Sequence, residues 1–258
     1  MVDNDALTAR VRTRRGNLAA TFDAVCAVLT ARGYLAGGDD SDRAADSAIA
    51  EARADPAVVA VGADWAIFAA EPDPAVVAVG ADPAGERVTD DGRRLSRLWS
   101  ESDLLVAECL RQGLWAGLSA ADLAAAVSVL VYESRRPEDA GPRVPGGAVA
   151  DAVDATYRLW ADLADDEREH GLSPTRQPDS GFAWPVHKWA RGERLDRVLV
   201  AGTGPDPLPA GDFVRWCRQL VDLLDQIAAA TAGTPLGRTA RGAIEAVRRG
   251  VVAYSELS

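Results

Sequence analysis

Apolar residues recur at three- and four-residue steps along much of this chain, and that spacing is typical of amphipathic α-helices. The first such stretch covers residues 17–34 and ends at Gly33, a residue type that commonly terminates helices. The pattern therefore predicts a helix near the N-terminus whose apolar stripe consists of Leu18, Phe22, Val25, Cys26 and Leu29.

The second half of the chain shows the same period in segments that are separated by loops rich in proline and glycine. One segment begins at Ser119, a good N-cap residue, and Asp122 lies three positions later as in a capping box. The other expected helices cover residues 102–113, 148–170, 212–227 and about 238–255. Helices joined by short loops, with little sheet, predict a mainly α fold, an orthogonal helical bundle rather than an α/β enzyme.

Residues 36–92 differ from the rest in composition. They hold 13 acidic and 3 basic residues, so this region carries nearly all of the net charge of −11. The unit "DPAVVAVGAD" occurs in it twice, at residues 55–64 and 73–82, which indicates a local duplication rather than a solenoid. Its "AVVAV" cores fit either short strands or a mobile acidic loop. We expect an acidic insert that is either partly β or mobile.

An Asp-Asp-Gly sequence between Val88 and Leu95 is a local signal for a tight turn and predicts a small β-hairpin. The chain is therefore expected to comprise a leading helix (1–35), the acidic insert with its duplicated segment and hairpin (36–92), and a helical bundle (93–258).

The stretch "DFVRWCRQLVDLLDQI", residues 212–227, separates its residue types by face. An apolar face is predicted for Val214, Cys217, Leu220, Leu224 and Ile227. The opposite side carries Arg215, Arg218, Gln219, Asp222, Asp225 and Gln226. This polar stripe is either an ordinary solvated face or a surface that forms hydrogen bonds with a ligand, and its residue types suit nucleic-acid bases.

Other candidate chemistry is sparse. The sequence contains no GxxxxGK[ST] loop, no HExxH and no GxSxG, so no catalytic residue and no metal ligand is assigned. Asp166 and His170 are four apart on an expected helix, and His187 lies between two tryptophans. Ordinary structural roles are favoured for all three. Packing is favoured over base stacking for Trp184, Trp189 and Trp216, and buried free thiols are favoured for Cys26, Cys109 and Cys217.

Several separated stretches together resemble a known family. They are "ESDLLVAECLRQGLWAGLSAADLAAAVSVLVYESRR", "WARGERLDRVL", "GDFVRWCRQLVDLLDQIA" and "ARGAIEAVRRGVVAYS". In this order they resemble the C-terminal helical (DSHCT) domain of superkiller-type DExH-box RNA helicases, in particular the actinobacterial, HelY-type form. The likeness extends to residues 1–35 and 87–258, which is nearly everything except the acidic insert.

The resemblance implies an accessory domain, non-catalytic by itself, that closes an RNA channel over a single strand. Its ratchet helix would be residues 212–227, with RNA-binding residues Arg215, Arg218, Gln219 and Asp222. Relatives carry Arg and Glu where this chain has Gln219 and Asp222, which weakens the expected grip on RNA.

The resemblance also determines the expected partners and cofactors. ATP and Mg²⁺ would belong to motor domains, in cis or in trans, whose motifs this sequence lacks. Single-stranded RNA and those motor domains are the expected partners. No membrane partner is expected, and the absence of a signal-like leader or a long apolar run predicts a cytoplasmic protein. The alternative is a stand-alone protein-interaction module.

Overall fold

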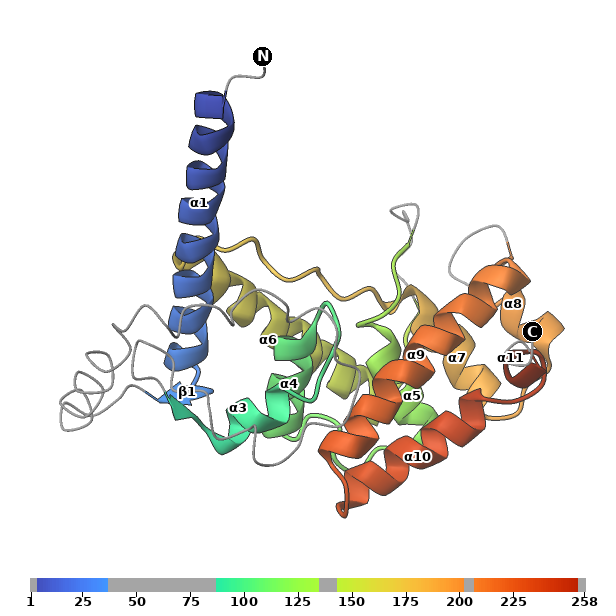
Figure 1. The fold of residues 1–258 in the computed structure, drawn as a ribbon. Helices are drawn as coiled ribbons and strands as arrows, with labels where there is room; N and C mark the ends of the chain where they lie inside the picture. The colour runs from blue at the N-terminus through green and yellow to red at the C-terminus, as the bar shows by residue number, and fades with distance from the viewer. Residues whose placement is uncertain (1–3, 37–86, 135–142, 202–206, 255–258) are drawn as a thin grey trace. The chain divides into compact units, whose positions relative to one another are not determined.

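The computed structural model describes residues 4–36, 87–134, 143–201 and 207–254, with side chains described from Leu18 to Ala253. The described part is mainly helical with one small two-stranded sheet, as predicted (Figure 1). Its elements are α1 (Asn4–Ala31), β1 (Leu35–Ala36), β2 (Arg87–Val88), α3 (Asp90–Leu95), α4 (Asp103–Arg111), α5 (Ala120–Ser128), α6 (Ala148–Glu169), the 3-10 helix η1 (Ser180–Phe182), α7 (Ala183–Ala190), α8 (Leu195–Leu199), α9 (Ala210–Ala230), α10 (Pro235–Val247) and α11 (Val251–Tyr254). The duplicated unit and its two "AVVAV" cores lie outside the described residues.

The chain divides into two compact units. One comprises Met1–Val25 and Arg94–Ser258, and the other comprises Cys26–Arg93. The division falls inside α1, whereas the sequence places its boundaries at 35/36 and 92/93. Those three sequence-based segments stay a prediction.

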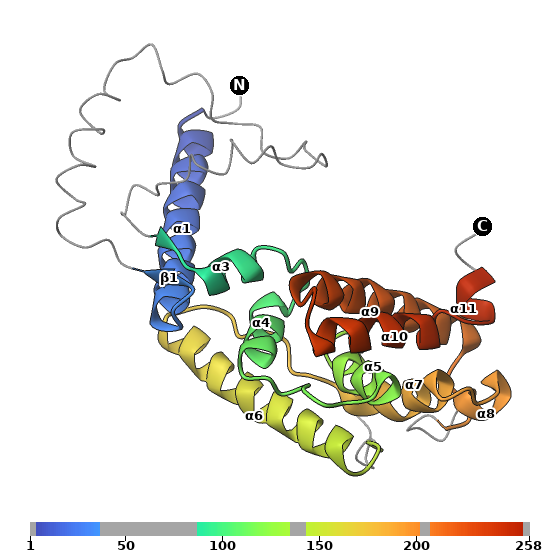
Figure 2. The same ribbon diagram turned by 90° about the horizontal axis from the view of Figure 1, so that it is seen from below.

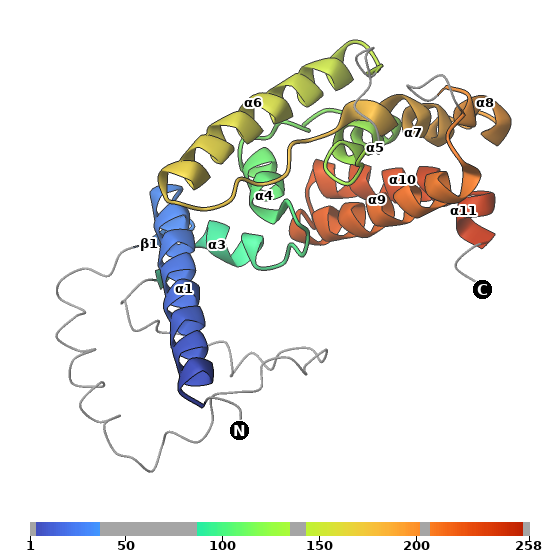
Figure 3. The same ribbon diagram turned by 90° about the horizontal axis from the view of Figure 1, so that it is seen from above.

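Helix α5 is the centre of the larger unit. It contacts α6, α7, α9 and α10, and Figures 2 and 3 show it enclosed among them. All side chains from Leu123 to Val127 are 0% exposed. Three of these five residues are alanine, and their small side chains allow the neighbouring backbones to approach closely. Ser119 caps the helix through its hydroxyl, which accepts the N–H of Asp122 at 3.3 Å, so the predicted capping arrangement is confirmed.

Helices α9 and α10 lie side by side and are joined by a tight turn (Figures 2 and 3). Gly233 has φ +81°, a conformation that favours glycine. Thr234 then caps α10 by accepting the N–H of Gly237 at 3.1 Å, and Pro235 occupies the first helical position. Beyond Val247 the chain leaves the helix, and Gly250 has φ +49°. The single helix predicted over 238–255 is therefore wrong, because α10 and α11 are separate.

In the second unit, the position predicted for the hairpin turn is wrong. β1 pairs with β2 in antiparallel register, Leu35 opposite Val88. The Asp-Asp-Gly sequence is not the turn between the strands but the beginning of α3. The Thr89 hydroxyl accepts the N–H of Gly92 at 3.1 Å, which makes Thr89 the cap of this helix. Asp90 and Asp91 lie in its first turn, where negative charge is favourable.

Helix α1 confirms the predicted N-terminal helix, but its apolar stripe is not fully buried. Leu18, Phe22 and Val25 are 72%, 56% and 39% exposed. Val28, which the predicted stripe omits, is instead 2% exposed. The period thus identified the helix, while the side that is buried near its C-terminal end differs from the predicted one.

Two glycines of α10 give a matched test of the packing. At Gly237 an added Cβ would overlap the backbone carbonyl of Thr231, whereas at Gly242 it would lie 3.5 Å from the Ala120 Cβ, an ordinary contact. We expect Gly237→Ala to lower the free energy of unfolding by about 1–3 kcal/mol, as overpacking does. Gly242→Ala should be neutral or stabilising by up to about 1 kcal/mol, because alanine is the better helix former. Urea denaturation of both variants checks this, and equal effects would contradict the described turn.

A second test concerns pH. Partial burial raises the pKa of Asp122, but hydrogen bonds from Ser119 and His187 outweigh this and hold the pKa below its ordinary value. A lowered pKa contributes stability above the unfolded-state value, about 3.9, that is lost as pH falls through the folded value. Asp122→Asn should therefore unfold at lower urea concentration than the unmodified chain at pH 7. The difference should shrink below about pH 4. A difference that grows toward low pH would contradict this assignment.

Candidate nucleic-acid interface

Helix α9 has the two faces that its sequence predicts. Cys217, Leu220, Leu224 and Ile227 are 0% exposed, and Val214 is half-buried instead of buried. Phe213, Trp216, Val221, Leu223 and Ala228 add to the buried face. Arg215, Arg218, Gln219 and Asp222 are exposed. The predicted polar stripe therefore lies on the surface of the bundle.

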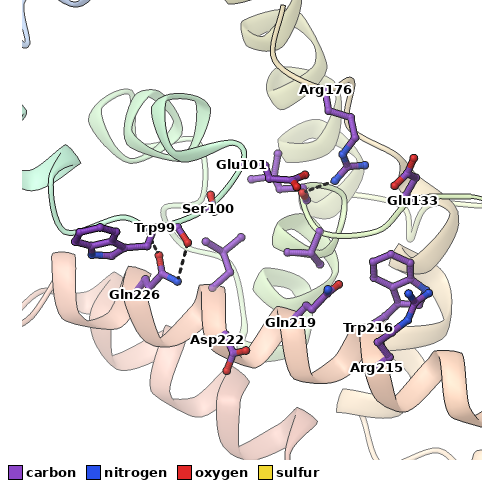
Figure 4. Close-up of a pocket in the computed structure, with 13 residues that line it drawn as sticks. Trp99, Ser100, Glu101, Glu133, Arg176, Arg215, Trp216, Gln219, Asp222 and Gln226 are labelled. Atoms are coloured by element: carbon purple, nitrogen blue, oxygen red, sulfur yellow. Dashed lines mark hydrogen bonds between the residues drawn. The ribbon is translucent and has the colours of Figure 1, made fainter. Parts of the chain in front are cut away.

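A surface pocket of about 450 Å³ runs along part of this stripe (Figure 4). Residues at steps of four, three and four along α9 form its floor: Arg215, Gln219, Asp222 and Gln226. The remaining lining comes from the segment before α4, the segment after α5 and the loop after α6: Trp99, Ser100, Glu101, Leu130, Val131, Glu133 and Arg176, with Trp216 and Leu223 of α9. The pocket thus includes three of the four predicted site residues. Arg218 is exposed on the same helix but does not line the pocket.

Hydrogen bonds to the backbone hold the walls of the pocket. The Trp99 N–H donates to Gln226 Oε1 at 2.6 Å, and Gln226 Nε2 donates to the Trp99 carbonyl at 3.5 Å. On another wall, the Arg176 guanidinium donates to the carbonyls of Tyr132 at 2.7 Å and Leu130 at 2.9 Å. Segments far apart in the sequence are therefore fixed against one another around α9.

The charge of the pocket is mixed. Glu101, Glu133 and Asp222 contribute three carboxylates, against the guanidinium groups of Arg176 and Arg215. Arg176 is engaged with backbone carbonyls. Arg215 lies over the Trp216 ring, 4.3 Å from its centroid, and its guanidinium is 3.5 Å from Asp212. A surface with an excess of carboxylates repels phosphate, but its amide, carboxylate and guanidinium groups can form hydrogen bonds with uncharged bases.

The histidines have structural roles, as favoured. His170 forms its 2.8 Å hydrogen bond with the backbone oxygen of Asp166, not with the carboxylate, and it caps the end of α6. His187 is buried and its Nε2 lies 3.0 Å from Asp122 Oδ1. This contact links α7 to the first turn of α5.

Two of the three tryptophans considered for stacking are packed, and the third is half-buried. Trp189 and Trp216 are 3% and 8% exposed, so packing is confirmed for both. The Trp189 Nε1 donates to the Val247 carbonyl at 2.8 Å, and Arg249 lies over its ring at 3.5 Å from the centroid. Trp184 is half-buried and lies beside His187, with 6.4 Å between ring centroids.

The cysteines agree with the prediction of free thiols. Cys109 and Cys217 are fully buried and Cys26 is half-buried. Burial raises the pKa of the Cys109 thiol to about 12, and it raises the pKa of Cys217 as well. Both are therefore protonated, packed side chains. Within the described ranges, no group of three or more His, Cys, Asp or Glu side chains is placed to hold a metal ion.

Sequence reasoning missed Trp99. This side chain is 79% exposed beside the pocket, and the hydrogen bonds to Gln226 connect positions 127 residues apart. Trp99 lies between α3 and α4, outside any helical period, so periodicity gave no reason to select it. The adjacent polar residues Ser100 and Glu101 were the one local signal that the position leaves the core.

Comparison with known proteins identifies the family. Residues 85–255 match the model of the DSHCT (NUC185) domain. The chain belongs to the DSHCT family. It is 51% identical over 175 residues to a probable helicase HelY of Mycobacterium leprae, and 49% identical over 174 residues to probable helicases HelY of Mycobacterium tuberculosis, strains CDC 1551 and H37Rv. These matches cover 65% and 64% of this chain and 19% of each relative, so the chain spans about a fifth of their length.

The family assignment confirms the resemblance seen in the sequence for residues 85–255, and its extension to residues 1–35 stays a prediction. The matched range includes α3 through α11 up to residue 255, and thus every residue that lines the pocket of the DSHCT domain. Among the described helices, none combines the length and apolarity needed to cross a membrane.

The Gln226 contact can be tested by itself. In Gln226→Ala, the Trp99 amide loses its acceptor, so its hydrogen exchange should accelerate by about tenfold or more while the free energy of unfolding falls by about 0.5–1.5 kcal/mol. Gln219→Ala is the control, because Gln219 lies on the same stripe and is exposed. In Gln219→Ala, the hydrogen-exchange rate of the Trp99 amide should match that of the unmodified chain. Unchanged exchange in Gln226→Ala would contradict the described wall.

Proposed function

We propose that this chain is a non-catalytic accessory domain of an ATP-dependent helicase, and that it guides a single strand of RNA along α9 as the ratchet helix. The observation that carries the proposal is the pocket floor, because three of its four α9 residues are the ones that the family resemblance selects: Arg215, Gln219 and Asp222. The similarity to helicases HelY supports the same assignment.

The stripe has dimensions that suit a strand. From Arg215 to Gln226 it rises about 16 Å along the helix axis, at about 1.5 Å per residue. Its side chains offer a guanidinium donor, the Gln219 amide, which both donates and accepts, and a carboxylate acceptor, while the Gln226 amide is engaged with the Trp99 backbone. This mixture matches the edges of unpaired bases, which carry donors and acceptors but no charge.

The charges in the pocket disfavour contact with the phosphates of a bound strand. The carboxylates Glu101, Glu133 and Asp222 make the pocket unfavourable for the backbone of a strand, so the bases face α9 in this proposal. Arg218 is exposed on the flank of the same helix and would contact a phosphate. ATP and Mg²⁺ would act in motor domains, in cis or in trans, which also form the remainder of the RNA channel.

A stand-alone protein-interaction module is the second candidate. The exposed apolar stripe of α1, formed by Leu18, Phe22 and Val25, is the feature that favours it. Salt distinguishes the two, since a phosphate contact such as the one proposed for Arg218 weakens between about 50 and 200 mM salt while an apolar protein contact changes little.

The proposal is tested in a chimeric helicase, with this domain replacing the matching segment of a mycobacterial HelY. The triple variant Arg215→Ala, Gln219→Ala, Asp222→Ala should reduce ATP-dependent unwinding by roughly ten- to thousandfold, because three hydrogen bonds are lost and each is worth about 0.5–1.5 kcal/mol. Its thermal stability should change little, since exposed substitutions usually cost less than about 0.5 kcal/mol.

Asp225→Ala is the matched control, because Asp225 is exposed on α9 but does not line the pocket. It should unwind at the unmodified rate. Normal unwinding by the triple variant would remove the ratchet assignment, and equal losses in both variants would show a general effect on α9.

A further inference from the structure

Trp99 is an exception among the described tryptophans. Trp115, Trp189 and Trp216 are 0%, 3% and 8% exposed, whereas Trp99 is 79% exposed. A large aromatic ring left in water does not contribute its burial to folding. Its exposure therefore has no explanation in the packing of the bundle.

The position of Trp99 is nevertheless fixed. Its N–H and its carbonyl are both hydrogen-bonded to the one side chain of Gln226, at 2.6 and 3.5 Å. The neighbouring Leu98 is 4% exposed, so the chain is anchored in the core immediately before the exposed ring. The backbone that carries the ring is thus held on both sides before any ligand arrives, which lowers the entropic cost of binding.

The ring lies at one end of the α9 stripe. Figure 4 shows Arg215 at the opposite end of the pocket from Trp99, with Gln219 and Asp222 between them and Gln226 directly beneath the Trp99 segment. The ring points outward at the rim instead of filling the pocket. A strand that follows the stripe would thus reach the ring as it leaves the polar floor.

We propose that Trp99 is a stacking platform for an unpaired nucleobase at the Gln226 end of the α9 stripe. This inference rests on the proposed function, because it adds a contact to the same track. Aromatic faces accept any base, and stacking of this kind operates without sequence preference. The residues that follow Trp99 in the chain, Ser100 and Glu101, and Gln226 beneath its backbone are polar, so a base with a polar edge suits this position better than an apolar protein side chain.

Stacking also supplies binding energy that the pocket floor does not obtain from phosphate contacts. The carboxylates around the pocket give little attraction for phosphate, so affinity must come from contacts to bases. A flat ring supplies such a contact without charge. Because stacking does not involve the 2′-hydroxyl, Trp99 should serve RNA and DNA strands alike, and discrimination between them would arise elsewhere.

The test uses the full 258-residue chain and fluorescein-labelled single strands, read by anisotropy at about 50 mM salt, where such binding is strongest. The probes are a ribo-oligonucleotide, its deoxyribo counterpart and a deoxyribo strand of the same length whose sugars are abasic. Trp99→Ala should weaken binding of both base-bearing strands by about five- to hundredfold, as loss of one stacked base does. Trp99→Phe should restore most of the affinity, and Val200→Ala, an exposed apolar residue outside the pocket, should bind normally.

The abasic strand separates stacking from a structural role. It should bind weakly and equally to the unmodified chain and to Trp99→Ala. An equal loss on base-bearing and abasic strands would overturn the inference, because the substitution would then act through the fold. Normal binding by Trp99→Ala together with weak binding by Gln219→Ala would overturn it while leaving the proposed function intact. No binding of any strand by the unmodified chain would contradict both.

Discussion

The complete burial of Leu123 to Ser128 in α5 is the constraint on which the rest of the bundle depends. Four helices, α6, α7, α9 and α10, pack against this one short helix, and its residues Leu123 to Val127 are inaccessible to solvent. Alanine at three of these positions leaves no room for larger side chains without displacing a neighbour. The N-terminal end of α5 is fixed as well, through the Ser119 cap and the contact of Asp122 with His187 on α7.

The orientation of α9 follows from this packing. Its apolar side chains pack toward α5 and α10, so its polar stripe faces outward. Arg176 then joins the loop after α6 to the segment after α5, and Gln226 of α9 holds the segment before α4 beside the stripe. The candidate interface is therefore a consequence of the core rather than an addition to it. Substitutions in the stripe should alter binding without unfolding the bundle.

The sequence predicted the features that depend on local periodicity. The helical bundle, the Ser119 cap and the outward side of α9 with Gln219 and Asp222 could all be read from spacing. The Asp-Asp-Gly segment could not, because the same residues suit a tight turn and the first turn of a helix capped by Thr89. Tertiary context decides between the two.

The wall of the pocket could not be predicted from local spacing either, because it also depends on tertiary contacts. Trp99 and Gln226 meet across 127 residues of sequence, and no period connects them. Arg218 is likewise not separated from the others by period, since its helical position is polar and exposed, yet it does not line the pocket that Arg215, Gln219 and Asp222 share. Family resemblance pointed to α9, but only the packed neighbours define which of its residues line the pocket.

The most direct test of the account is photo-crosslinking of a single-stranded RNA containing 4-thiouridine to the chain, with the attachment sites mapped by mass spectrometry. Crosslinks are expected at the stripe of α9, between Arg215 and Gln226, and at Trp99. Crosslinks confined to other surfaces, such as the exposed arginines of α10, would contradict the claim that α9 carries the strand.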